Sequence, residues 1–97
     1  MDESEVARAV AYFEACDDLR LLHDVLRSIR PRAAAEVRKH ERRGSRVPAP
    51  LTIPPAADPS TREEALRTVK GANDFGQLQA LSRTIGRRVE ALQESEP

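Results

Sequence analysis

The sequence contains few of the residues that build a large core or a covalent framework. It has no Trp and three aromatic residues, Tyr12, Phe13 and Phe75, so the side chains that usually contribute most buried area are scarce. Its one cysteine, Cys16, excludes an intramolecular disulfide and is typical of a reducing compartment. A chain of 97 residues with this composition is predicted to form one small domain, residues 1–97, with a thin core.

Long apolar runs and a basic leader are also missing. The longest uninterrupted apolar run covers residues 9–13, whereas a membrane-spanning helix needs roughly 18 apolar residues. The first residues are acidic, while a signal peptide begins with a basic region. We therefore expect a cytoplasmic protein that does not associate with membranes.

The sequence lacks the usual signatures of catalysis and of metal or cofactor binding. Its two histidines are His23 and His40, and Glu36 with His40 would supply two metal ligands one helical turn apart, which is too few. No HExxH or CxxC pattern occurs, and no nucleophile can be placed beside a base. We therefore predict that the protein is not an enzyme and uses no cofactor or metal.

The formal net charge is zero, but the charges are unevenly distributed. Residues 1–26 carry seven acidic and two basic side chains, whereas residues 27–46 carry eight basic and two acidic ones. These segments either neutralise one another within the fold or across a dimer, which we favour, or the basic segment contacts phosphate. That segment has no aromatic residue on which bases could stack. The candidate nucleic-acid-binding residues are Arg38, Lys39, Arg42, Arg43 and Arg46.

The strongest periodic pattern lies in residues 74–94 and predicts a helix. Its apolar residues recur at spacings of three and four and fall on one stripe: Leu78, Leu81, Ile85, Val89 and Leu92. Asp74 followed by Gln77 is a capping-box pattern that indicates where this helix begins. We expect Leu81 and Ile85 at the centre of the core, facing Leu19, Leu22 or Leu26 of the first helix.

A shorter helix is predicted over residues 60–71, where Ser60 and Thr61 precede Glu63 and Glu64 at capping spacing. A tight corner at Ala72 would join it to the terminal helix. This arrangement also permits a helix-turn-helix motif, whose base-reading residues would be Gln77, Gln79, Ser82, Arg83 and Thr84. The second helix of such a motif is usually short and half apolar, so the long continuous stripe favours packing in a bundle.

The first helix is predicted over residues 3–30, a stretch without Gly or Pro. Its apolar residues change face near Asp18. Either the helix breaks there, with an Asp capping a second segment, or one long helix contacts partners on two sides; we prefer the continuous helix. Pro31 is expected to end this helix and to begin another over residues 31–43, which is poor in apolar side chains and stops at Gly44.

Five of the seven prolines fall within residues 44–61, which predicts an extended Pro-rich strap, with Leu51 and Ile53 directed at the bundle. The predicted fold is all-α, a small bundle of three to four helices. The core is thin, and a first helix that is apolar on two faces needs two partners, so we expect a homodimer. The predicted function is protein-protein interaction or assembly, with the same or another protein as partner. The alternative is a nucleic-acid-associated protein that contacts phosphate through residues 27–46.

Overall fold

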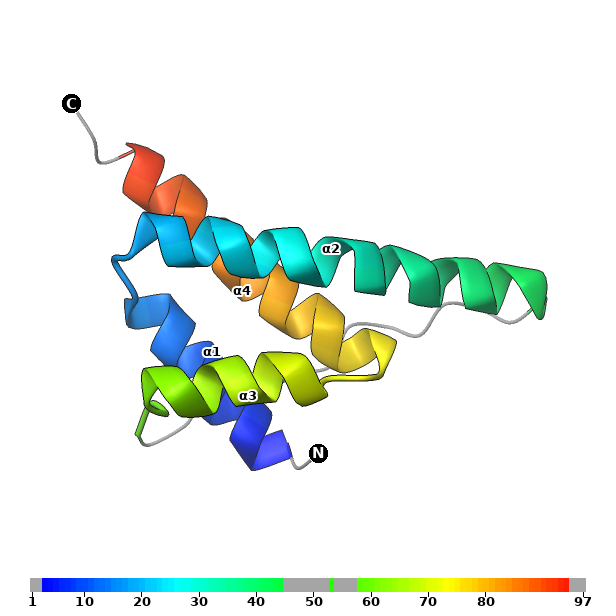
Figure 1. Ribbon diagram of the computed structural model, residues 1–97, viewed down its shortest axis with the longest axis horizontal. Coiled ribbons are helices and arrows are strands. Elements are labelled where there is room, and N and C mark those ends of the chain that lie inside the picture. The colour runs from blue at the N-terminus through cyan, green and yellow to red at the C-terminus, as the bar shows by residue number, and fades with distance from the viewer. Residues whose placement is uncertain (1–2, 45–52, 54–57, 95–97) are drawn as a thin grey trace.

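The computed structural model describes residues 3–44, 53 and 58–94. Within these ranges the chain forms no strand and four helices, α1 (Glu3–Ala15), α2 (Leu19–Arg42), α3 (Arg62–Gly71) and α4 (Phe75–Glu94) (Figure 1). The all-α prediction is confirmed. Most of the predicted Pro-rich strap, including Leu51, lies outside the described residues. Ile53 is described; it is half-buried and lines a surface cavity with Val10 and Ala80.

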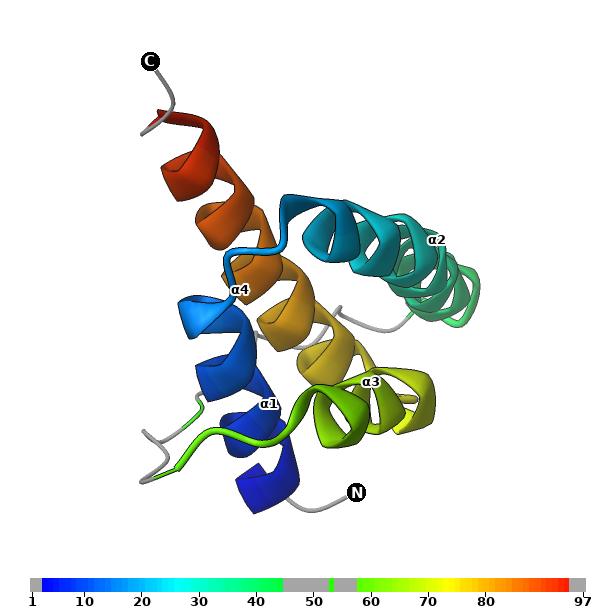
Figure 2. The same ribbon diagram turned by 60° about the vertical axis from the view of Figure 1, so that its left-hand side comes forward.

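The terminal helix α4 is the one against which the longer helices pack. Both α1 and α2 contact α4, and Figure 2 shows α4 running between them, while α3 contacts α1. Leu81 and Ile85 are fully buried, and they share one core with Leu22 and Leu26 of α2. The apolar stripe of residues 74–94 therefore predicted the packing axis of the bundle correctly.

The N-terminal segment is two helices, and the predicted continuous helix over residues 3–30 is wrong. Asp18 is the N-cap of α2, where its Oδ1 accepts a hydrogen bond from the Leu21 N–H at 3.1 Å. The interruption lets both apolar faces enter the same core, because Phe13 of α1 and Leu22 of α2 are each fully buried in one cluster. The two faces therefore need no second subunit to cover them, and only the thinness of the core still favours the predicted homodimer.

The second helix boundary was also predicted wrongly, because α2 continues through Pro31 to Arg42. A proline inside a helix removes one backbone donor and costs about 3 kcal/mol relative to Ala. Pro31 is exposed, so water can hydrate the carbonyl that loses its partner. Contacts on both sides hold the helix together: Ile29 is fully buried, and Arg32 is bound to α3.

Arg32 closes the C-terminal end of α3. Its Nη1 donates to the carbonyl oxygen of Val69 at 2.8 Å, and its Nη2 donates to the carbonyl oxygens of Lys70, at 3.3 Å, and Ala72. The last carbonyls of a helix lack partners within the helix and carry partial negative charge, so a guanidinium group stabilises them. One of the arginines in the basic segment is therefore a structural residue that joins α2 to α3.

A second arginine holds the junction between α1 and α2. The Arg88 Nε of α4 donates to the carbonyl oxygen of Cys16 at 2.7 Å, and its Nη2 lies 3.9 Å from the Asp17 carboxylate.

At the start of α3, Thr61 and Glu64 form the predicted capping box, with hydrogen bonds of 3.2 and 3.3 Å. Within the described ranges no helix has both the length and the apolar character needed to cross a membrane.

Candidate functional site

The C-terminal half of α2 projects beyond the other helices (Figure 1). The N-terminal half of α2 buries Leu21, Leu22, Val25, Leu26 and Ile29. After Ile29 every residue of α2 is exposed or half-buried, and Ala33 is the last to pack against the core. We call residues 34–43 the α2 arm, which includes the C-cap residue Arg43. No side chain of the α2 arm is fully buried, so this segment contributes little to the stability of the bundle.

The α2 arm carries four of the five candidate nucleic-acid-binding residues. Arg38, Lys39, Arg42 and Arg43 are all exposed, and Arg46 lies outside the described residues. Residues four apart share a helix face, so Arg38 lies on the same face as Arg42, and Lys39 lies on the same face as Arg43. These two faces are about 100° apart around the helix. The structure therefore brings four cations to one projecting end, in two pairs that face different directions.

Most of these cations have no acidic partner among the residues that the structure describes. Lys39 Nζ lies 3.5 Å from the Glu36 Oε1, in an exposed pair within one helical turn. Arg38, Arg42 and Arg43 form no ion pair with any described residue. Some of these basic residues also stabilise the end of α2, because cations near a helix C-terminus interact favourably with the helix dipole. The free guanidinium groups nevertheless present planar sets of donors that match phosphate oxygens.

The other polar groups of the α2 arm do not form a metal site. Glu36 and His40 are half-buried on one face, and the His40 Nδ1 is buried without a hydrogen-bond partner among the described residues. Throughout the described part of the chain, no group of three or more His, Cys, Asp or Glu residues is close enough to bind a metal ion. Binding of anions is therefore the chemistry that the side chains of the α2 arm support best.

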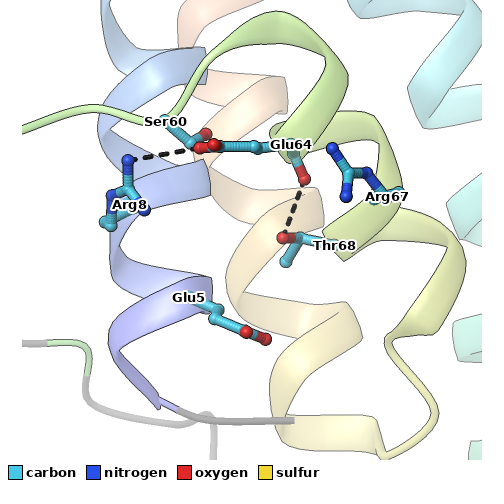
Figure 3. A pocket seen from close by; sticks show the side chains of 6 residues that line it. All are labelled: Glu5, Arg8, Ser60, Glu64, Arg67 and Thr68. Atoms are coloured by element: carbon cyan, nitrogen blue, oxygen red, sulfur yellow. Dashed lines mark hydrogen bonds and ion pairs between the residues drawn. The ribbon is translucent and has the colours of Figure 1, made fainter.

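A cleft of about 330 Å³ lies between α1 and α3 and is the second place where polar side chains gather (Figure 3). Its lining residues are Glu5, Arg8, Ser60, Glu64, Arg67 and Thr68. The Arg8 Nη2 lies 3.2 Å from the Glu64 Oε2, and the Ser60 N–H donates to the Arg8 carbonyl oxygen at 3.0 Å. The Thr68 Oγ1 donates to the Glu64 carbonyl oxygen at 3.0 Å.

Arg8 and Glu64 of this cleft are therefore occupied in joining α1 to α3, and Thr68 is bonded within α3. The Ser60 Oγ is buried and has no hydrogen-bond partner within the described ranges, and because it is buried it does not meet a molecule entering from solvent. Small-molecule sites are mostly lined by apolar and aromatic side chains, which this cleft lacks. We interpret the cleft as the seam between two helices.

The structure does not bring the five residues of the possible helix-turn-helix motif to one exposed face. Gln77 is buried, and Thr84 is half-buried with its Oγ1 bonded to the carbonyl oxygen of Ala80 at 3.0 Å. Arg83 is exposed, whereas Gln79 and Ser82 are half-buried. Because α4 packs against both α1 and α2, it is not free to enter a DNA groove along its length.

Cys16 and Tyr12 lie at the end of α1, at the opposite end of α2 from the arm. Cys16 is buried, as expected of a small apolar residue. Tyr12 packs edge-to-face on Phe13, with ring centroids 5.3 Å apart. Partial burial, followed by the neighbouring Cys16, raises the pKa of Tyr12, so this phenol stays neutral near neutral pH. These residues serve packing.

Comparisons with protein-family models, with curated proteins and with solved structures find no match for this chain. The functional proposal therefore rests on the geometry of the described residues.

Proposed function

We propose that the protein is a non-enzymatic binding protein whose working surface is the α2 arm, and that its partner is nucleic acid contacted through phosphate. The observation that supports this proposal is the state of Arg38, Arg42 and Arg43, which are exposed, without ion pairs among the described residues, and carried by a helix segment that the core does not need. Helical segments in proteins are stabilised mainly by tertiary packing. A partner that docks on the α2 arm would supply the packing that the bundle does not.

The charge and the side-chain sizes on the α2 arm favour a polyanion over another protein. The apolar residues of this segment are Ala34, Ala35 and Val37, whereas the hot spots of protein interfaces usually include large aromatic side chains such as Trp and Tyr. Two copies of the α2 arm facing one another would oppose like charges. Phosphate groups complement these arginines directly.

Protein-protein assembly, which the sequence analysis favoured, stays a prediction, as does the cytoplasmic location. A homodimer would now require a surface other than the two N-terminal apolar faces, because both of these enter one core. Light scattering at tens of micromolar protein measures the oligomeric state directly. A dimer would support assembly and is compatible with binding through the α2 arm, whereas a monomer would end the homodimer prediction.

The proposal is tested by fluorescence anisotropy with a mixed-sequence nucleic acid at increasing salt. Four phosphate contacts release enough counterions to lower the affinity by on the order of 100-fold between 50 and 200 mM salt. The variant Arg38→Gln/Arg42→Gln/Arg43→Gln should lose most of this binding, since Gln preserves helix propensity but removes the charge.

A matched control is Arg67→Gln/Arg83→Gln/Arg87→Gln, which removes the same total charge from three exposed arginines on α3 and α4. This control should bind nearly as tightly as the unaltered protein. Absence of binding at low salt, or an equal loss in both triple variants, would contradict the proposal, because the second result would show that only total charge matters.

A further inference from the structure

The outer face of α2 carries exposed arginines along nearly the whole helix, from the bundle to the arm. These residues are Arg20, Arg27, Arg30, Arg38 and Arg42. None of them forms an ion pair with a described residue. At 100° per residue they fall within a sector of about 120°, nearly opposite the buried side chains of Leu22, Val25 and Ile29. We call these five residues the arginine track.

We infer that the arginine track lies along duplex nucleic acid over a length of about one helical turn and contacts phosphates where the backbones cross it, without reading the sequence. This inference rests on the proposed function and extends its surface from the α2 arm onto the bundle. From Arg20 to Arg42 the helix rises about 33 Å at 1.5 Å per residue. One turn of a duplex measures about 34 Å, so the track and the turn match in length.

The passage of α2 through Pro31 makes the track possible. Figure 1 shows α2 running as one helix from the bundle into the arm, so Arg20 and Arg27 remain in register with Arg38. A helix that ended at Pro31 would have placed these two groups of arginines in unrelated directions. Pro31 and Ala34 lie between the groups on the same face, and both are exposed and small, so neither blocks the approach of a duplex.

Two acidic residues lie on the same side of α2 as the track. Asp24 is exposed at one edge of the sector, and Glu41 is exposed just inside the other edge. Asp18, at the N-terminus of α2, lies 3.7 Å from Arg62 Nη1, and Asp17 pairs with Arg88 at 3.9 Å. Five arginines therefore share this face with two carboxylates that form no ion pair with a described residue, and the face remains cationic.

The side-chain types on α2 favour a duplex over a single strand. Proteins that hold single strands stack the bases on aromatic side chains, and α2 contains no Phe, Tyr or Trp. A rigid row of arginines instead suits a stiff duplex, which carries a high density of phosphate charge along its length. The partner class is therefore double-stranded nucleic acid bound through its backbone.

The test uses a variant in the bundle half of the track, Arg20→Gln/Arg27→Gln, which leaves the α2 arm intact. Each phosphate contact contributes about 0.9 to the slope of log affinity against log salt, so this variant should make the slope for a duplex of about 20 base pairs less steep by about 1.8. The control Arg67→Gln/Arg87→Gln should keep the slope of the unaltered protein. The duplex should also bind more tightly than either of its separated strands.

The outcomes separate this inference from the proposed function. If the α2-arm variant loses binding while Arg20→Gln/Arg27→Gln retains the full slope, the arginine track is wrong and the proposed function stands. Tighter binding of the single strands would likewise overturn the choice of a duplex. If the unaltered protein binds neither form at low salt, both proposals fail.

Discussion

The two halves of α2 belong to one uninterrupted helix, yet the bundle depends on only one of them. In the N-terminal half the side chains of Leu22, Val25 and Ile29 are buried against α4, whereas no side chain of the α2 arm is fully buried. The arm is helical because Ala, Arg, Lys and Glu favour helix, and because it extends a helix that is already nucleated. The comparison shows that helix formation and core formation are separable, which leaves the second half available for binding.

The largest expected difference between the two halves of α2 is in the stability that is lost when an apolar side chain is shortened to Ala. Leu22→Ala, or Leu81→Ala in the same core, should lower the free energy of unfolding by about 2–5 kcal/mol, because each leaves a cavity among fully buried residues. Val37→Ala on the α2 arm should cost well under about 1 kcal/mol. Urea denaturation measures all three. If Val37→Ala proved as costly as Leu22→Ala, the arm would be part of the core.

The next effect concerns Arg32, which stands at the boundary between the two halves. Arg32→Ala should lower the free energy of unfolding by about 1.5–3 kcal/mol, because it removes charge-assisted hydrogen bonds to the end of α3. Arg30→Ala is the control, since Arg30 is exposed and has no ion pair with a described residue; its change should stay within about 0.5 kcal/mol. Equal stabilities of the two variants would mean that Arg32 does not tie α2 to α3.

A smaller effect tests where the N-terminal half of α2 begins. Asp18→Ala removes the N-cap and should cost about 0.5–2 kcal/mol, whereas Asp24→Ala, on an exposed turn of the same helix, should be nearly neutral. Thermal or chemical unfolding measures the difference. If the helix were continuous through residues 16–18, Asp18→Ala would instead raise the stability, because Ala favours a helix interior more than Asp does.

The smallest effect on global stability is expected within the α2 arm itself. Ala35→Gly should weaken the local helix by up to about 1 kcal/mol, while the denaturation midpoint of the whole protein stays nearly unchanged. Circular dichroism should show a small loss of helical signal without a change in cooperativity. A clear drop in the midpoint would show that the arm and the bundle unfold as one unit.

The sequence predicted those features that depend on local residues. The stripe containing Leu81 and Ile85 indicated the packing axis, and the pairing of Thr61 with Glu64 indicated the start of α3, because both patterns lie within a few residues. The exposure of Arg38, Lys39, Arg42 and Arg43 is also a local feature, because it reflects the small number of apolar side chains in their segment.

The helix boundaries near Asp18 and Pro31 could not be predicted from local sequence patterns. Asp18 offered a cap and Pro31 offered a break, and the structure uses the first and not the second. The cost of Pro31 is offset by the bonds of Arg32 to carbonyls 37 to 40 residues away, which no local pattern reveals. The arginine track depends on the same fact, because only a helix that is continuous through Pro31 aligns Arg20 with Arg38.

The most direct test of the α2 arm as a binding surface is hydrogen exchange of its backbone amides with and without a duplex of about one to two helical turns. In the free protein, amides of residues 34–43 should exchange much faster than those around Leu81 in α4, because no side chain of the arm is fully buried. Addition of the duplex should slow exchange in the arm and leave the region around Leu81 unchanged. The account is contradicted if the arm is already as protected as α4 in the free protein, or if the duplex leaves its exchange unaltered.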